Sequence, residues 1–465
     1  MITFQDFEKL TTEQEQMTFV LSAINAHKGS DAYKQAVIAD QYNKHKNVTI
    51  TKYQKILYTV TGKAIPDNFS ANFKMACNHF HRFIIQENQF LLGNGASWDN
   101  DSIENSLGTK KYPFDNQLQE LGKNSLLHGV SYGFWNFDHV DVFKLTEFVP
   151  LFDEEDGSLK AGIRFWQIDS TKPLRATLYE LDGYTDIIWR VGQDYEILQP
   201  KRAYKLKVNQ SKADGVEIYD GENYPGFPII PMYGNPEHQS ELTGLREQID
   251  CYDLIKSGFA NTVDEASYVY WTIQNAGGMD DVDLAKFVER MKTLHAAVID
   301  ETGASAESHQ QDVPYASRET LLSMLDRDLY RDAMALDVES IASGAATATQ
   351  IRAAYEPLNS KCDEYEYCVR EFISNLLELV NIESEVSFTR SMIVNKAEDV
   401  NCILSAAQYL SEEYVTQKIL EILGDGDRAD EILNERDAEG ADRFGMNNNN
   451  VDNNNNVDNT DAVIE

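Results

Sequence analysis

Residues 349–380 read TQIRAAYEPLNSKCDEYEYCVREFISNLLELV. Apolar side chains recur along this stretch at alternating spacings of three and four, which is the period of one helix face. At 1.5 Å per residue the predicted helix would span about 45–50 Å. Pro357 lies inside it and should kink it, because proline lacks the amide that would bond to the preceding turn. The apolar positions are Ile351, Tyr355, Leu358, Cys362, Tyr365, Val369, Phe372, Leu376 and Val380.

Two shorter predicted helices precede this stretch and enclose a small αβ unit. The first helix covers 240–265 and carries six acids against two bases, so we expect an acidic outer face. The second helix begins near Ser317, a residue suited to the N-cap, and carries five acids against three arginines. The unit between them reads as a strand at 268–273, a helix at 282–294 and a strand at 296–300.

The rest of the chain separates into helical and β-rich parts, which makes the fold class α+β. Residues 1–95 look mainly helical, and 70–85 form the clearest amphipathic piece. Between 131 and 230, short runs rich in Val, Ile, Tyr, Phe and Trp alternate with turn residues, which is typical of antiparallel strands. The clearest predicted strands are 161–168, 184–191 and 202–208, and the predicted C-terminal helices are 397–409, 412–423 and 428–436.

Composition limits the functions that the chain can have. Its 465 residues suggest two to four packed modules. The sequence contains no run of about 18 apolar residues and no start typical of a secretory signal, so we expect no membrane segment. Five scattered cysteines without a CxxC pair indicate a reducing compartment and free thiols. The net charge of −35 excludes binding of DNA by the chain as a whole through basic residues. This charge either serves solubility alone or repels nucleic acid that passes nearby.

Motifs for catalysis are weak or missing. Gly129-Val-Ser-Tyr-Gly133 matches the nucleophile elbow of serine hydrolases, but a strand is predicted after Ser131 where the elbow needs a helix. The sequence has no GxxxxGK[ST] loop for nucleotide phosphates and no carboxylate cluster typical of a nuclease. His79 and His81 point to different helix faces and cannot easily share a metal. We therefore expect no cofactor and no metal, and a serine hydrolase using Ser131 remains an alternative.

Several weak segments in a fixed order together carry a resemblance. Pro228-Ile-Ile-Pro231 followed by Ile249-Asp-Cys-Tyr252 is similar to a proline pair before a helix start, and Ser343-Gly-Ala-Ala resembles a Ser-Gly-x-Ala segment that opens a long helix. The residues after it, Thr347, Ala348 and Thr349, depart from the hydrophobic residue that is common there. Over about residues 35–436 the chain resembles the portal proteins of tailed bacteriophages, of the type found in phages of Gram-positive bacteria. The segments are 72–93, 228–235, 240–252, 343–351 and 411–435.

The resemblance implies a portal-type fold rather than an enzyme. Family portals form rings, usually of twelve subunits, at one capsid vertex, where DNA is packaged and later ejected. The implied divisions are a wing of helices and antiparallel strands at 1–239, a stem helix at 240–265, an αβ clip at 266–316, a second stem helix at 317–336, a tunnel loop at 337–348, a long kinked wing helix at 349–384, a helical crown at 385–436 and a disordered, acidic, Asn-rich tail at 437–465.

The resemblance also implies partners and site residues. The expected partners are further copies of this chain, the terminase large subunit, a head–tail adaptor, scaffolding and major capsid proteins, and double-stranded DNA that passes with weak contacts independent of its sequence. The protein would lie in the virion after assembly in the host cytoplasm, without contact to a membrane. Another head-completion or connector protein is an alternative. The implied site residues are Ser340, Ser343, Gly344, Thr347 and Thr349 for the tunnel loop, Glu247, Asp250, Asp253, Asp264, Glu265, Asp326 and Asp328 for the acidic stem face, Tyr268, Tyr270 and Trp271 for docking at the clip, and Pro357 for the kink.

Overall fold

The computed structural model describes most of the chain. The described residues are 2–59, 61–68, 70–100, 102–209, 218–266, 270–274, 280, 282, 283, 285–287, 289, 305–309, 315–339, 348–391, 396–423 and 432. They form two compact units, the first made of Met1–Ser343 with Ala353–Ser391 and the second of Gly344–Arg352 with Met392–Glu465. Within the described residues, none of the helices is both long and apolar enough to cross a lipid bilayer.

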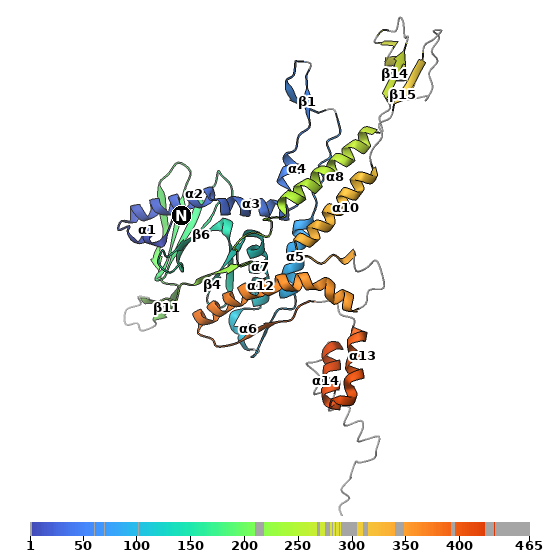
Figure 1. Cartoon of the computed structure of the whole chain (residues 1–465). Coiled ribbons are helices and arrows are strands. Elements are labelled where there is room, and N and C mark those ends of the chain that lie inside the picture. The colour runs from blue at the N-terminus through green and yellow to red at the C-terminus, as the bar shows by residue number, and fades with distance from the viewer. Residues whose placement is uncertain are drawn as a thin grey trace, which may run out of the picture. The chain divides into compact units, whose positions relative to one another are not determined.

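The first unit contains both helices and antiparallel strands, and most of its strands follow one another in the chain (Figure 1). Its helices are α1 (Phe4–Glu8), α2 (Glu13–Gly29), α3 (Asp31–Asn43), α4 (Val48–Lys52), α5 (His79–Leu92), α6 (Ser102–Leu107), α7 (Phe114–His128), α8 (Arg246–Ala266), α10 (Tyr315–Asp332) and α12 (Ala348–Val380), of which α12 begins in the second unit. The second unit contains α13 (Lys396–Ala406), the 3-10 turn η2 (Ala407–Tyr409) and α14 (Glu412–Leu423), and α13 contacts α14.

A five-stranded antiparallel sheet packs against the N-terminal helices. Its strands follow the order β10-β9-β8-β7-β6. α2 begins with a capping box in which Thr12 and Glu15 each bond the other's backbone amide, and it then buries Val20 and Ile24 against the sheet. Alternating buried side chains such as Ile163 face this helix, as expected for a half-covered sheet. The strands are β6 (Phe148–Phe152), β7 (Leu159–Trp166), β8 (Leu174–Glu180), β9 (Gly183–Trp189) and β10 (Tyr195–Arg202).

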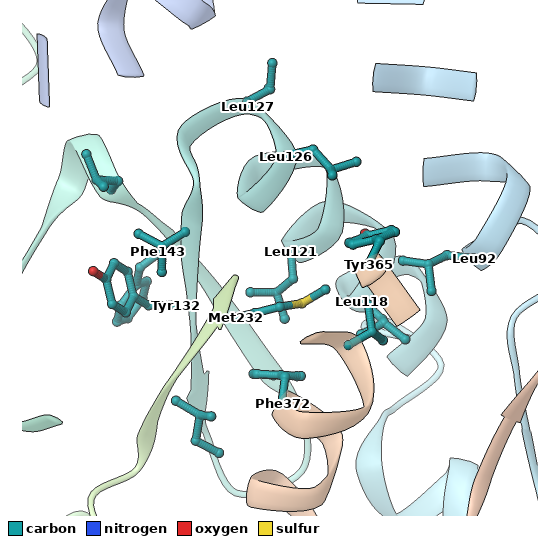
Figure 2. Packing of buried hydrophobic residues seen from close by; sticks show 14 of the residues in the cluster. Leu92, Leu118, Leu121, Leu126, Leu127, Tyr132, Phe143, Met232, Tyr365 and Phe372 are labelled. Atoms are coloured by element: carbon teal, nitrogen blue, oxygen red, sulfur yellow. The ribbon is translucent and has the colours of Figure 1, made fainter. Parts of the chain in front are cut away.

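The largest core lies where α5, α7 and α12 meet a three-stranded sheet of order β13-β4-β5. Figure 2 shows Leu121 of α7 and Met232 of β13 beside Tyr365 and Phe372 of α12. All four side chains are at most 1% exposed. Burying each such side chain stabilises the fold by about 1.5–3 kcal/mol, so this cluster holds the long helix in place. The strands are β4 (Val130–Trp135), β5 (Val140–Lys144) and β13 (Ile229–Tyr233).

Four two-stranded pairs and one short turn complete the first unit. All four pairs are antiparallel, and the β3–β16 pair joins the residues that lie farthest apart in the sequence. The pairs are β1 (Ile56–Tyr58) with β2 (Ala64–Pro66), β3 (Ala96–Trp98) with β16 (Val386–Phe388), β11 (Lys205–Asn209) with β12 (Ile218–Glu222), and β14 (Tyr270–Gln274) with β15 (Ser305–His309), and the 3-10 turn is η1 (Leu145–Glu147).

The α+β class and several elements are confirmed. The long helix, predicted over 349–380, runs from Ala348 to Val380, and Pro357 lies inside it. The helix predicted over 412–423 has these bounds, and Ser411 Oγ accepts a hydrogen bond from the Tyr414 amide at 3.4 Å. The predicted strands 161–168 and 184–191 correspond to β7 and β9, whereas 202–208 covers the end of β10 and most of β11.

Two helix starts were predicted wrongly, and a third differs from the prediction by about two residues. Residues 71–78 are not helical, and the helix there begins only at His79. The helix predicted from 240 begins at Arg246, because Gly244 has a left-handed φ of 87° and Ser240 Oγ donates to the Leu127 carbonyl. The helix predicted near Ser317 already begins at Tyr315, whose ring packs edge-on against Phe259 of α8.

The remaining predictions are confirmed in part, contradicted in part, or lie outside the described residues. The hairpin of β1 and β2 interrupts a region predicted to be mainly helical. The described residues between 282 and 289 are helical, in agreement with a helix predicted over 282–294. The predicted strand 296–300 and the tail 437–465 lie outside the described residues, as does the helix 428–436 except for residue 432.

Candidate functional site: the helix pair α8 and α10

The candidate site is built on α8 and α10, which contact each other. Near the end of α8, Arg318 of α10 donates to Thr262 Oγ1 at 2.9 Å, and its guanidinium lies 5.7 Å from the centre of the Phe259 ring. At the other end, the Gln248 side-chain amide donates to Asp332. Because side-chain contacts join both ends, the two helices form an antiparallel pair.

One face of α8 carries three buried polar side chains, four residues apart. Asp253, Ser257 and Asn261 are at most 3% exposed. They accept hydrogen bonds from backbone amides of an extended segment: Asp253 Oδ1 from Cys77 at 2.7 Å, Ser257 Oγ from Met75 at 2.9 Å and Asn261 Oδ1 from Phe73 at 2.7 Å. We call this set of three hydrogen bonds the amide ladder.

The amide ladder depends on a match between two repeat lengths. Four residues of an α-helix rise about 6 Å, and two residues of an extended chain rise about 6.6 Å. Every second amide of 73–77 therefore meets every fourth side chain of α8, with the two segments running in opposite directions. These amides are then not available for helical bonds, which explains why 71–78 is not a helix despite its helical pattern.

Asp253 lies in the interior and is not part of an outer acidic face, so this part of the prediction was wrong. It is 0% exposed and also accepts a hydrogen bond from Asn47 Nδ2 at 2.5 Å. Burial raises the pKa of the Asp253 carboxyl, although the hydrogen bonds from Asn47 and Cys77 lower it. Burial, together with the Asp253 charge, also raises the pKa of the Cys77 thiol to about 12.

Three further acids of the predicted face are held by partners within the chain. Asp250 accepts hydrogen bonds from Tyr42 Oη at 2.5 Å and Thr49 Oγ1 at 2.7 Å. Glu265 forms an ion pair of 2.5 Å with Lys55, near the β1–β2 hairpin. Asp326 of α10 lies 2.7 Å from His79 Nε2 at the start of α5. These carboxylates attach the helix pair to the rest of the first unit.

The remaining acids of the set are more accessible. Glu247 is exposed, and Asp264 and Asp328 are half-buried. Asp328 Oδ1 lies 3.6 Å from Arg331 Nη1, an exposed pair of the kind that contributes little to stability. The charge that α8 and α10 present to solvent is therefore smaller than their composition indicates.

A buried lysine connects the long helix to the segment before α8. Lys361 Nζ of α12 lies 2.8 Å from Glu87 Oε2 of α5 and 2.6 Å from Glu241 Oε2. Burial raises the pKa of Glu87 to about 7, although the charge of Lys361 lowers it. Burial lowers the pKa of Lys361, but the two carboxylates outweigh this effect and raise it. Three segments far apart in sequence thus share one ionic contact.

Most of the predicted tunnel-loop and clip residues are not among the residues that the structure describes. Ser340, Ser343, Gly344, Thr347 and Tyr268 lie outside the described residues. Thr349 is exposed in the first turn of α12. Tyr270 and Trp271 lie in β14, where they pair with His309 and Ser308 of β15. Strand formation at the clip is confirmed, whereas docking there remains a prediction, as does the kink at Pro357.

The structure contradicts a nucleophile elbow at Ser131. This serine is 0% exposed in β4, and its Oγ donates to the Leu121 carbonyl at 2.8 Å. The order is helix then strand, the reverse of an elbow. The two glycines have other roles: Gly129 ends α7 with a φ of 86°, and a Cβ at Gly133 would lie 2.7 Å from the Phe372 ring.

Neither metal binding nor thiol chemistry is indicated in the part of the chain that the structure describes. No group of three or more His, Cys, Asp or Glu side chains there could hold a metal ion. All five cysteines are free, with Cys77, Cys362 and Cys368 buried and Cys251 and Cys402 exposed. The free thiols agree with the sequence analysis.

Two residues of the amide ladder, Ser257 and Asn261, were not among the predicted site residues. Ser257 and Asn261 follow Asp253 at spacings of four, so a polar stripe on one helix face was visible in the sequence. Their partner segment, residues 73–77, could not be predicted, because it binds through backbone amides, which every residue except proline has. Lys361 was equally hidden, since its partners Glu87 and Glu241 are far away in sequence.

Comparisons with known proteins agree with this architecture. A family model described as "Phage portal protein, SPP1 Gp6-like" matches residues 27–441. The "Portal protein" of Clostridium phage phiCD119 is 24% identical over 273 residues, which is 56% of this chain and 58% of that protein. The "Portal protein" of Bacillus phage SPP1 is 22% identical over 400 residues, or 76% of this chain and 74% of that protein.

Two solved structures are also similar. A chain in the "Neck of empty GTA particle computed with C6 symmetry" has a TM-score of 0.47 and 11% identity, covering 74% of this chain and 90% of that one. A chain in the "Neck of native GTA particle computed with C12 symmetry" has a TM-score of 0.43 and 12% identity, covering 73% and 89%. The family match extends over most of the sequence, including both helices of the pair. The chain therefore belongs to the SPP1 Gp6-like family of phage portal proteins.

Proposed function

We propose that copies of this protein close into a ring, of twelve subunits as is usual in the family, at one vertex of the phage capsid. DNA enters through this ring during packaging and leaves through it during ejection. The observation that carries the proposal is the family match over residues 27–441. It also weighs against the alternative of another head-completion protein, because the matching model is that of portals.

Exposed apolar side chains on the helix pair support association between copies. Val263 of α8 is 41% exposed, and Tyr315, Leu321 and Met324 of α10 are 53%, 43% and 53% exposed. Apolar groups gathered on two adjacent helices are typical of a surface that another chain covers. A ring provides such a neighbour for every subunit through one repeated contact.

The channel wall would let DNA pass because it does not bind the DNA strongly. Duplex DNA carries one negative charge per about 1.7 Å, so a basic wall would hold it and slow its movement. The net charge of −35 prevents this for the protein as a whole. Of the acids predicted to form the stem face, Glu247, Asp264 and Asp328 remain accessible, and we assign the repulsion to them. The tunnel loop 337–348, rich in small and hydroxyl residues, would add few strong contacts.

The other parts of the chain would serve as docking surfaces. The clip, built on β14 and β15, would bind the terminase large subunit during packaging and a head–tail adaptor afterwards. The crown at 385–436 would lie inside the capsid, and the wing would face scaffolding and major capsid proteins. Assembly would take place in the host cytoplasm, before the ring becomes part of the virion.

Electron microscopy of the purified full-length protein tests the ring directly. Negative-stain class averages should show particles with a central hole and about twelve-fold symmetry, the closed cyclic arrangement expected of a repeated heterologous contact. Size-exclusion chromatography with light scattering should give a mass equal to a multiple of the subunit mass of 52.7 kDa. A protein that stays monomeric at every concentration would contradict the proposal.

Charge reversal at Glu247 tests the channel wall. Glu247→Lys should slow DNA packaging in an assay with terminase and proheads, because each ring then carries one new cation per subunit beside the DNA. Glu155→Lys, an equal change at an exposed turn of the wing, is the matched control and should package at the normal rate. Equal packaging rates for both variants would count against a repulsive wall.

A further inference from the structure

An exposed apolar and basic surface covers residues 51–75, which we call the hairpin arm. It contains the β1–β2 hairpin and the extended segment that follows. All six residues of β1 and β2 are exposed, so this hairpin has no core of its own. The large apolar residues exposed on the arm are Tyr53, Ile56, Leu57, Tyr58, Ile65, Phe73 and Met75, with exposed fractions from 37% to 75%.

Polar contacts to its own subunit hold the arm beside α8. Within the arm, Lys74 Nζ donates to the Thr51 carbonyl at 2.8 Å. Toward α8, Lys55 pairs with Glu265 and the amide of Phe73 donates to Asn261. These contacts fix the arm along the second half of α8, where Figure 1 shows the hairpin extending from α4. They leave the apolar side chains uncovered. An isolated two-stranded hairpin is only marginally stable in water, so a covering partner is expected.

The charge of the arm indicates what that partner is. The arm carries four lysines, Lys52, Lys55, Lys63 and Lys74, against one acid, Asp67, which is buried. The chain as a whole has a net charge of −35, and α8 and α10 together carry nine acids against five bases. Four of these nine acids, Asp250, Asp253, Glu265 and Asp326, have partners within the subunit, so the helix pair is complementary to the arm chiefly through its exposed apolar groups.

We propose that the hairpin arm of one subunit docks on α8 and α10 of the neighbouring copy. This inference rests on the proposed ring. The docking requires a ring axis that runs along the helix pair, because rotation about such an axis keeps every segment at its own height. The arm lies level with the second half of α8. Within the same subunit, the aromatic side chain of Tyr315 packs against that of Phe259, which places the start of α10 at this level too. The neighbour therefore offers Val263, Tyr315, Leu321 and Met324 for the apolar residues of the arm and Glu319 for its lysines.

Chemical cross-linking tests this contact in the full-length protein. The exposed cysteines are first removed as Cys251→Ser and Cys402→Ser, and Tyr58→Cys is then combined with Met324→Cys. A short bismaleimide should convert the double variant into a ladder of covalent oligomers, whereas each single variant should stay monomeric on a denaturing gel. Rings that are visible by microscopy but give no ladder would overturn the docking and leave the ring itself standing. Absence of any ring would instead overturn the proposed function.

Assembly of a variant that lacks the apolar arm gives a second, independent measurement. Ile56→Ser, Leu57→Ser and Tyr58→Ser together should leave the folded subunit intact, since all three side chains are exposed. Ring formation should then need at least about a tenfold higher subunit concentration, the effect of losing one apolar anchor. Ile168→Ser, at a wing turn where the side chain is 88% exposed, is the control and should assemble normally. Assembly of the triple variant at the normal concentration, or cross-linking of Tyr58→Cys to another capsid component only, would contradict the inference.

Discussion

Removing the Asp253 carboxylate should loosen the segment that lies against α8. In Asp253→Ala, the amide of Cys77 loses an acceptor at 2.7 Å and Asn47 Nδ2 loses one at 2.5 Å. Asn47 keeps a second, longer contact of 3.3 Å to the Cys77 carbonyl. The Cys77 amide is therefore the group that is left without a partner in a site that water does not reach.

The size of the effect follows from these two bonds. A buried donor without an acceptor costs about 1–3 kcal/mol, and the weakened Asn47 contact adds about 1 kcal/mol. Removal of a buried charge offsets part of this loss of free energy, because burial disfavours the charged form of Asp253 and so raises its pKa. We expect a net loss of about 2–3 kcal/mol in the free energy of opening this segment.

Amide hydrogen exchange measures this loss locally. The protection of the Cys77 amide should fall by roughly 30- to 150-fold in Asp253→Ala, which is the expected free energy expressed as a rate ratio. Ser257→Ala is a matched variant that should expose the Met75 amide first. Glu247→Ala, at an exposed acid of the same helix, should change neither amide. Unchanged protection of Cys77 in Asp253→Ala would refute the role of the amide ladder.

The substitution Asp253→Asn gives a milder version of the same experiment. The side-chain carbonyl of the introduced asparagine could still accept from Cys77, while its amide would face Asn47. Within the described residues, Asn47 Oδ1 is buried without a hydrogen-bond partner, so a turn of the Asn47 side chain offers an acceptor. Asp253→Asn should therefore lose less protection at Cys77 than Asp253→Ala. An equal loss in the two variants would show that the charge matters more than the bonds.

Two further predictions concern the core. Gly122→Ala should lower the free energy of unfolding by about 1–3 kcal/mol in urea titrations, because the added Cβ would overlap Tyr365 Oη. Glu87 has a folded-state pKa of about 7, above its ordinary value, so its contribution to stability is present at low pH and lost as the pH rises toward 7. The stability of the wild type relative to Glu87→Gln should therefore fall by about 2 kcal/mol between about pH 5.5 and about pH 8, and a constant difference would contradict the raised pKa.

Elements with a single strong period could be predicted from the sequence. In α12, apolar side chains from Tyr365 to Phe372 recur at helical spacing and are buried, so the pattern and the packing agree. The helix Glu412–Leu423 has a capping serine before it and a regular apolar face. Strands such as β7 alternate buried and exposed positions between clear turns. In each case, local propensity and tertiary contacts favour the same structure.

The segment 71–78 could not be predicted, because tertiary bonds override its pattern. Its apolar spacing is helical, yet three of its amides bond to side chains of α8 that are about 180 residues away in the sequence. The β1–β2 hairpin has no buried face, so no periodicity marked it. Of the residues predicted for the tunnel loop and the clip, the described part of the chain includes Thr349, Tyr270 and Trp271.

The partners of each acid decide where the charge of the channel should be tested. An acid on an amphipathic helix can face solvent, a backbone amide or a lysine, and composition does not distinguish these cases. In α8, Asp253 is directed at backbone amides and Glu265 at Lys55, so their charges have partners within the subunit. A lysine at either position would damage the fold or release the hairpin arm, and packaging would fail for a reason unrelated to DNA. Glu247 is exposed, so charge reversal at this position separates repulsion of DNA from loss of structure.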